Sequence, residues 1–218
     1  MPRALFEKTG NALYISHLDL MRVFQRAFKR AGLALTHTKG YNPRPSVSIA
    51  LPLSLGVESC CELLDFELEG EAVSNEEICR RLNDALIDGV HVLSVYDEMR
   101  KIKEIALLDC RLYLEYDKGV PETALSQIRE LFSRDSLVVE KKGKNGITEQ
   151  DIIPMIRKLE AVQKGQEICL SAVICCQNPS LNPMQLTAAI TKYLPVLKPD
   201  FVRCCRVEVY DTKETVFR

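Results

Sequence analysis

Residues 16–32 read SHLDLMRVFQRAFKRAG, and their pattern predicts an amphipathic helix. At 100° per residue, one arc of this helix is apolar and the opposite arc is cationic. The apolar arc consists of Leu20, Val23, Phe24, Ala27, Phe28 and Ala31. The cationic arc consists of Arg22, Arg26, Lys29 and Arg30. Because Gly32 stands where a C-terminal cap belongs, the pattern indicates a helix over 18–31 that packs one face on a core.

The start of this helix allows two interpretations. Ser16 and Asp19 stand three residues apart, which is typical of a capping box with Asp in the place of Glu or Gln. The alternative makes His17 and Asp19 a catalytic pair, with His17 as the general base. Residues two apart do not face each other on a helix, and the sequence places no second carboxylate or serine nucleophile beside them. We favour the cap and keep His17 as the alternative, catalytic candidate.

Outward from this helix, the hydrophobic pattern predicts a βαββαβ order. Strands are expected at 3–9, 47–51, 62–69 and 90–98. A second helix is expected at 74–89, where Ser74 and Glu77 form a capping box and Gly89 ends the segment. This order is the split βαβ arrangement of ferredoxin-like folds.

The same order recurs after a linker at 99–106. Strands are expected at 108–116, 136–141, 166–176 and 202–210, and helices at 121–132 and 182–194. Between the second and third of these strands we expect an insertion near 142–165, with a short helix near 148–157. The predicted fold class is therefore α+β, with two tandem ferredoxin-like (βαββαβ) units at 1–98 and 107–218.

The charge is unevenly distributed although the net charge is only −1. Residues 1–45 hold eight Lys and Arg against two acids, whereas residues 46–100 hold three against twelve. The basic stretch continues into KGYNPRP (39–45), where the prolines stiffen the backbone and an aromatic ring and a guanidinium offer stacking surfaces to a base. We expect RNA binding by Arg22, Arg26, Lys29, Arg30, Lys39, Tyr41, Asn42 and Arg44. The alternatives are a solvated helix face and a rigid turn that feeds the strand after it.

The nine cysteines predict buried, reduced thiols. Six of them form the adjacent pairs Cys60–Cys61, Cys175–Cys176 and Cys204–Cys205. Adjacent residues of a strand point to opposite faces, so such a pair does not offer both sulfurs to one ion. There is no C-x-x-C, and no cysteine has a histidine at zinc-ligand spacing. We therefore expect neither a metal nor a cofactor.

The sequence predicts a cytoplasmic protein with no membrane partner. No stretch approaches the roughly 18 uncharged apolar residues that cross a bilayer. The N-terminal MPRALFEKTG carries charges where a signal peptide would have its apolar core.

Three motifs within residues 5–69 carry a resemblance to a known family: S-H-L-D-L-x-R, G-Y-N-P-R-P and P-L-S-L-G-V-E-S. Together they resemble a bacterial family of radical SAM-linked proteins with a DUF2344 domain, whose members are encoded beside, or fused to, a radical SAM protein. The resemblance implies a genomic and physical partner rather than a reaction. This chain lacks C-x-x-x-C-x-x-C, whose three thiolates hold a radical SAM cluster, so it is not expected to be the radical enzyme itself.

We therefore expect a non-catalytic accessory protein of a radical SAM enzyme, which binds RNA or presents a substrate through residues 16–45. One alternative is a protein-interaction module that docks the radical SAM partner through the same basic face. The other is an RNA-processing enzyme centred on His17, for which the tandem order is similar to that of CRISPR repeat-processing RNA endonucleases.

Overall fold

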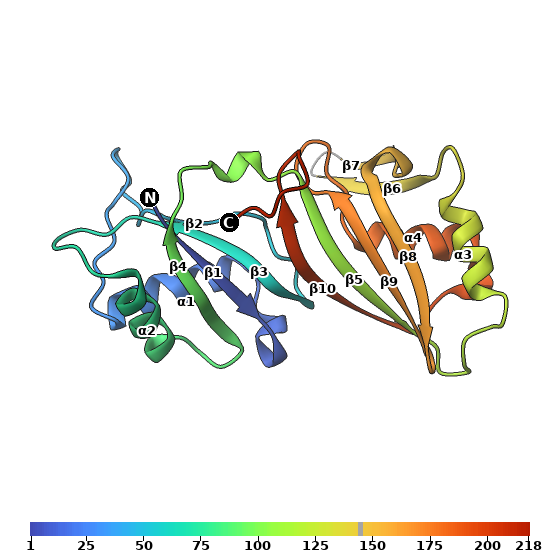
Figure 1. Cartoon of the computed structure of the whole chain (residues 1–218), viewed down its shortest axis with the longest axis horizontal. Helices are drawn as coiled ribbons and strands as arrows, with labels where there is room; N and C mark the ends of the chain where they lie inside the picture. The colour runs from blue at the N-terminus through green and yellow to red at the C-terminus, as the bar shows by residue number, and fades with distance from the viewer. Residues whose placement is uncertain (144–145) are drawn as a thin grey trace. The chain divides into compact units, whose positions relative to one another are not determined.

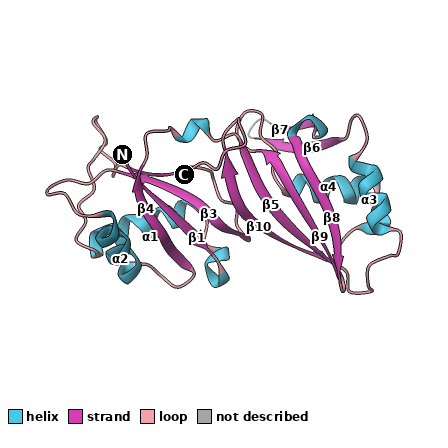
Figure 2. Cartoon of the chain, viewed as in Figure 1, coloured by secondary structure: helices cyan, strands magenta, loops and turns pink. Residues whose placement is uncertain are grey.

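The structure is a computed structural model that describes residues 1–143 and 146–218. The chain is a mixed α+β protein and divides into two compact units. The first unit is Met1–Ile102 together with Arg218, and the second is Lys103–Phe217. The boundary between them falls within 99–106, at the short 3-10 turn η2 (Ile102–Glu104). Figure 2 distinguishes the strands of each unit from its helices.

The first unit builds a sheet with helices packed on it. Its elements are β1 (Pro2–Lys8), the 3-10 turn η1 (Gly10–Tyr14), α1 (His17–Arg30), β2 (Val47–Ile49), β3 (Val57–Phe66), α2 (Asn75–Ala85) and β4 (Val90–Asp97). Within this unit the strand order is β4-β1-β3, and β2 pairs with β3. All of these pairs are antiparallel. The helices α1 and α2 supply one side of the core (Figure 1).

The helix α1 forms where the sequence predicts it. Its apolar arc packs against the sheet, which stabilises the helix. The buried residues of α1 are Leu20, Phe24, Ala27 and Phe28. The ring of Phe24 lies 4.7 Å from that of Phe6 on β1, centroid to centroid, and the ring of Phe28 lies 4.9 Å from that of Phe66 on β3. Such aromatic pairs stabilise a core beyond the area that they bury. After the helix, Gly32 takes a left-handed φ of 67°, as a C-terminal glycine cap does.

The second unit contributes four neighbouring strands to a sheet and forms a separate hairpin. Its elements are β5 (Leu107–Glu115), α3 (Ala124–Phe132), β6 (Val138–Gly143), β7 (Gly146–Asp151), η3 (Ile153–Met155), β8 (Ile156–Lys164), β9 (Glu167–Cys175), α4 (Met184–Tyr193), η4 (Pro195–Leu197) and β10 (Phe201–Tyr210). Its sheet has the order β10-β5-β9-β8, with antiparallel pairing throughout. Within the described residues, β6 and β7 pair only with each other.

Two predictions for the second unit are wrong. The strand expected at 136–141 forms as β6, but it does not take the expected place in the main sheet, because β6 pairs with β7 instead. The short helix expected near 148–157 does not form, because these residues belong to β7, η3 and the start of β8. The strand next to β9 is β8, Ile156–Lys164, so the last part of the expected insertion near 142–165 belongs to the sheet. Residues 144–145 of that insertion lie outside the described residues.

The sequence pattern does not predict β8 as a strand, and the reason is physical. It lies at the end of the strand order and exposes charged side chains such as Arg157 and Lys158. Its register shifts between Ile156 and Lys158, so the apolar positions Ile156, Leu159 and Ala161 do not alternate strictly. A bulge of this kind adds one residue to the period of two, and the resulting spacing of three imitates a helix.

Candidate nucleic-acid interface

The predicted cap forms at the start of α1. Ser16 Oγ accepts a hydrogen bond from the Asp19 N–H at 3.2 Å and donates one to Asp19 Oδ2 at 2.7 Å. Arg22 Nη1 donates a hydrogen bond to Asp19 Oδ1, also at 2.7 Å. The Ser16 hydroxyl and the Arg22 guanidinium, in that order of importance, lower the pKa of the Asp19 carboxyl. The helix start is therefore a local network in which Arg22 already has an anionic partner.

The alternative catalytic pair is not assembled at this position. His17 is the first residue of α1 and is half-buried. Its Nδ1 is buried and has no hydrogen-bond partner among the described residues. The Asp19 carboxylate is engaged by Ser16 and Arg22 rather than by His17. A catalytic role for His17 stays a prediction. Asp19, the predicted partner, does not orient the His17 imidazole.

The remaining cations of α1 differ in how far they are engaged. Arg30 Nη2 donates a hydrogen bond to the backbone carbonyl of Ala85, at the end of α2. Arg26 and Lys29 are exposed, and neither side chain makes a hydrogen bond or ion pair in the part of the chain that the structure describes. Since residues three apart are neighbours on a helix surface, Arg26 and Lys29 form the part of the cationic arc that is most available to an anion.

The KGYNPRP segment forms a loop whose two ends are hydrogen-bonded. The Thr38 N–H donates to the Arg44 carbonyl at 2.8 Å, and the Arg44 N–H donates to Thr38 Oγ1 at 3.0 Å. One step closer to the sheet, the Ser46 N–H donates to the Thr36 carbonyl at 2.8 Å. The Thr36 N–H in turn donates to the Glu67 carbonyl at 2.9 Å, just after β3. The loop is thus held at its base by backbone bonds and stiffened near its end by prolines.

The tip of this loop presents its side chains to solvent. Lys39, Tyr41, Asn42 and Arg44 are all exposed, and the loop extends from the first unit (Figure 1). Tyr41 is 108% exposed, so its ring is as open to water as in an isolated residue. None of these four side chains makes a hydrogen bond, ion pair or ring contact with another described residue. The tip therefore offers one aromatic ring and two cations that make no contact of these kinds with other described residues.

The predicted binding residues thus fall into two groups within the first unit. One group is on α1 and comprises Arg22, Arg26, Lys29 and Arg30; the other is on the loop and comprises Lys39, Tyr41, Asn42 and Arg44. No hydrogen bond or ion pair joins the two groups within residues 1–143 and 146–218. Sequence reasoning missed Thr38, whose hydroxyl closes the loop. Its threonine side chain is a common partner for backbone N–H groups, but a partner six residues away cannot be read from spacing alone.

Two of the buried cysteines, Cys110 and Cys204, have thiols that are poor nucleophiles. Burial raises the pKa of Cys110 and raises the pKa of Cys204 to about 11. Such thiols are protonated at neutral pH, whereas nucleophiles and metal ligands are thiolates. Among the described residues, no three His, Cys, Asp or Glu side chains are grouped closely enough to hold a metal ion. Every described helix is too short or too polar to cross a membrane.

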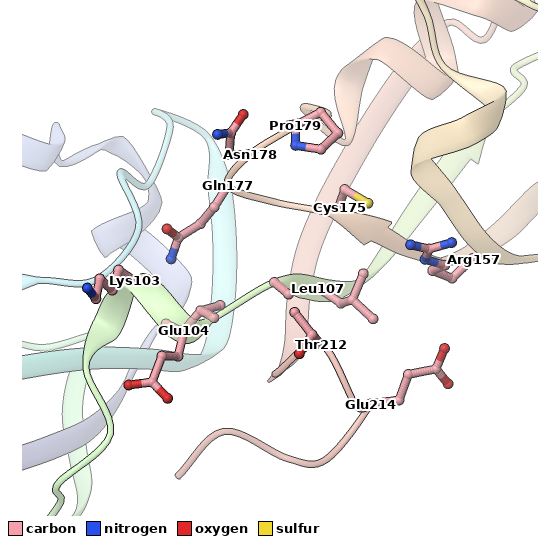
Figure 3. Close-up of a pocket in the computed structure, with 12 residues that line it drawn as sticks. Lys103, Glu104, Leu107, Arg157, Cys175, Gln177, Asn178, Pro179, Thr212 and Glu214 are labelled. Atoms are coloured by element: carbon pink, nitrogen blue, oxygen red, sulfur yellow. The ribbon is translucent and has the colours of Figure 1, made fainter.

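A pocket of about 380 Å³ lies in the second unit, near the start of β5 and the end of β9 (Figure 3). Its lining includes the cations Lys103 and Arg157 and the acids Glu104 and Glu214. Opposite charges are therefore mixed around it, and no single ligand charge is selected. None of the residues predicted to bind RNA lines this pocket.

Comparison with known proteins identifies a family and a fold. The profile of a family described as "Uncharacterized protein conserved in bacteria (DUF2344)" matches residues 2–183. No curated protein matches the chain. A chain in a crystal structure of a Cbf5-Nop10-Gar1 complex is similar over 95% of this chain, with a TM-score of 0.52 and 9% identity. This chain spans 48% of that chain, and at such low identity the likeness concerns the fold alone. An unknown protein from Galdieria sulphuraria is 10% identical over 94% of this chain and 96% of its own, with a TM-score of only 0.27.

Proposed function

We propose, for a chain that belongs to the DUF2344 family of proteins conserved in bacteria, that its first unit binds RNA through α1 and the loop at 38–45. The observation that carries the proposal is the loop tip, where Lys39, Tyr41 and Arg44 are exposed on a segment whose ends are hydrogen-bonded. A cation on a pre-organised loop loses less freedom when it binds. Contacts between such cations and phosphates release counterions, which drives binding to nucleic acids.

The charge distribution of the first unit supports the same proposal. Arg26 and Lys29 add exposed cations on α1, where neighbouring positions stand about 6 Å apart, close to the phosphate spacing of a single strand. Two of the three acids of α2, Glu77 and Asp84, are engaged within their own helix. Glu77 is paired with Arg80 and Arg81, and Asp84 is also paired with Arg80. These acids therefore do not neutralise the cations of α1.

The order of the strands in the two units supports a proposal about the fold. We infer that they are tandem ferredoxin-like units. The support is that β4-β1-β3 with β2 in the first unit and β10-β5-β9-β8 in the second share one order of strands and the same antiparallel pairing. In the second unit the β6–β7 hairpin is inserted after the first helix. A split βαβ unit of this kind is one of the recurrent supersecondary arrangements.

We further propose that the chain is a cytoplasmic accessory protein of a radical SAM enzyme, to which it delivers RNA or presents a substrate. The resemblance of S-H-L-D-L-x-R and G-Y-N-P-R-P to the radical SAM-linked family supports this role, and the absence of C-x-x-x-C-x-x-C fits a partner rather than the radical enzyme. Co-expression with the radical SAM protein encoded nearby, followed by size-exclusion chromatography, should recover a complex. Separate elution of the two proteins at micromolar concentration would contradict this role.

Fluorescence anisotropy tests RNA binding directly. Purified protein is titrated into labelled tRNA and rRNA fragments over a series of salt concentrations. Arg44→Ala should weaken binding about equally for all sequences and lower the salt slope by about one unit. Lys118→Ala, an exposed cation of the second unit, is the matched control and should leave affinity unchanged. If no RNA binds at low salt while Arg44→Ala breaks the complex with the radical SAM protein, the basic face is a protein-docking surface instead.

A further inference from the structure

We infer that Tyr41 stacks on an unpaired base, so that the loop at 38–45 selects single-stranded over duplex RNA. The inference rests on the proposed function, because it names the class of RNA that the same site takes. It starts from Tyr41, the most exposed of the large hydrophobic residues in the described chain, at 108%.

The surroundings of Tyr41 distinguish it from other exposed aromatic residues. Isolated apolar side chains on a surface are ordinary and need no ligand to explain them. In the sequence, however, Tyr41 lies between two exposed cations, Lys39 and Arg44, on a loop whose ends are joined by the Thr38–Arg44 hydrogen bonds. One strand of RNA carries a phosphate on either side of each base. A ring flanked by two cations therefore matches a base flanked by two phosphates.

The backbone holds this arrangement before any ligand binds. Gly40 takes a φ of 146°, a conformation that other residues rarely adopt, and it turns the chain immediately before Tyr41. Pro43 and Pro45 fix their own φ angles and restrict the residues that precede them. Because the loop is closed at its base by hydrogen bonds and its prolines restrict the backbone, stacking has to immobilise fewer torsions than in an unrestrained segment.

The ring can only stack on a base whose face is free. In a duplex both faces of an internal base are covered by its neighbours, whereas single strands and loops can turn a base outward onto an aromatic side chain. Phosphate contacts by the cations of α1 and the loop are available to both forms of RNA. The aromatic contact alone should therefore separate the two forms.

Affinity for matched oligonucleotides tests the inference. Labelled single-stranded RNA of about 12 nucleotides, within the usual site sizes of single-strand binding folds, and the duplex of the same sequence are titrated with wild type, Tyr41→Ala and Tyr41→Phe. Loss of one stacking contact should weaken single-strand binding by about 5-fold to 150-fold. Tyr41→Phe keeps the ring and should keep the affinity. Tyr14→Ala removes a tyrosine that is 74% exposed in the same unit and should change neither affinity.

A fluorescent variant gives a second readout that does not depend on affinity. The chain has no tryptophan, so the Y41W variant carries a single one. Stacking on a base should quench its emission when single-stranded RNA is added, and duplex should quench it far less.

The outcomes separate the stacking inference from RNA binding itself. If Tyr41→Ala binds single strands as tightly as wild type while Arg44→Ala does not, stacking is wrong and RNA binding stands. If wild type binds neither RNA, the proposed function fails. If Tyr41→Ala instead loses only the complex with the radical SAM protein, the ring contacts protein and the inference is overturned.

Discussion

The guanidinium of Arg22 donates a 2.7 Å hydrogen bond to the carboxylate of Asp19, three residues before it on α1. Arg26, one turn further along, has no such partner among the described residues. Both side chains of the pair are more than half exposed, so the pair contributes little to the stability of the fold. It nevertheless competes with an external anion for Arg22.

Arg26→Ala should therefore weaken RNA binding more than Arg22→Ala does. Arg26 meets a phosphate without leaving another partner, whereas Arg22 has to give up Asp19. Each phosphate contact that is lost should lower the slope of log affinity against log salt by about one unit, and this slope is measured by anisotropy. Asp19→Asn provides the complementary test, because releasing Arg22 should raise affinity and steepen the slope. Equal losses for the two arginine variants would show that the Asp19 pair does not restrict Arg22.

The buried pair of Arg3 and Asp65 should dominate the stability of the first sheet. Arg3 Nε and Nη2 donate to the two carboxylate oxygens of Asp65 at 2.6 and 3.1 Å, across paired positions of β1 and β3. Asp65→Asn removes this carboxylate from a guanidinium that is 2% exposed, which costs about 3–5 kcal/mol. Urea unfolding followed by circular dichroism measures this cost. Asp97→Asn, at an exposed position of β4, is the control and should shift the midpoint little; a similar midpoint for both variants would refute the prediction.

Gly89 should tolerate no side chain. It has a φ of 79°, and a Cβ atom would lie 2.4 Å from the Thr9 carbonyl oxygen and 2.9 Å from Ala12 Cβ. The Thr9 N–H also donates to the Gly89 carbonyl at 2.8 Å, which holds the two segments together. Gly56 is the matched control, because it has a φ of 76° and a Cβ atom there would have no neighbour within 4 Å.

Gly56→Ala should lose about 1–2 kcal/mol of unfolding free energy from the left-handed backbone alone. Gly89→Ala should lose clearly more, because the Thr9 carbonyl accepts the Ala12 N–H at 3.1 Å and cannot move away from the new Cβ atom without weakening that hydrogen bond. The comparison uses the thermal midpoints of the two variants. If the two losses agree within error, the contact with Thr9 is not what requires glycine at position 89.

The stability of the first unit should fall in acid partly through Glu98. The Arg100 guanidinium, at 2.9 Å, is the main cause that holds the pKa of the Glu98 carboxyl at about 2, and the N–H groups of Arg100 and Met99 add to it. The ordinary value is 4.5. A pKa that is lower in the folded state means that the contribution is present above pH 4.5 and is lost as the pH falls toward 2.

Glu98→Gln should therefore lower stability at neutral pH and flatten the loss of stability between pH 4.5 and about pH 2. Urea midpoints at several pH values measure both effects. Glu76→Gln, at an exposed position of α2, is the control and should leave the acid profile of the wild type unchanged. An acid profile of Glu98→Gln that still follows the wild type would assign the loss to other carboxylates.

Several features of the protein were determined by the sequence alone, because their partners lie within one helical turn. The apolar arc of α1, the Ser16 cap and the glycine at its end are set by residues three or four positions apart. The predicted helix over 18–31 therefore agrees closely with α1, His17–Arg30. The exposure of the loop cations follows in the same way from a proline-rich segment that has no apolar face to bury.

Which strands pair, and which cations already have hydrogen-bond partners within the protein, follows only from the tertiary structure. The Arg30 side chain reaches the carbonyl of Ala85, 55 residues away, and Arg3 reaches Asp65, 62 residues away. Likewise, β8 rather than the 136–141 segment lies beside β9, although 136–141 has a continuous apolar run, Leu137 to Val139. Local spacing records helix faces and caps, but the choice among strands depends on the free energy of the whole packed sheet, to which each segment contributes only part.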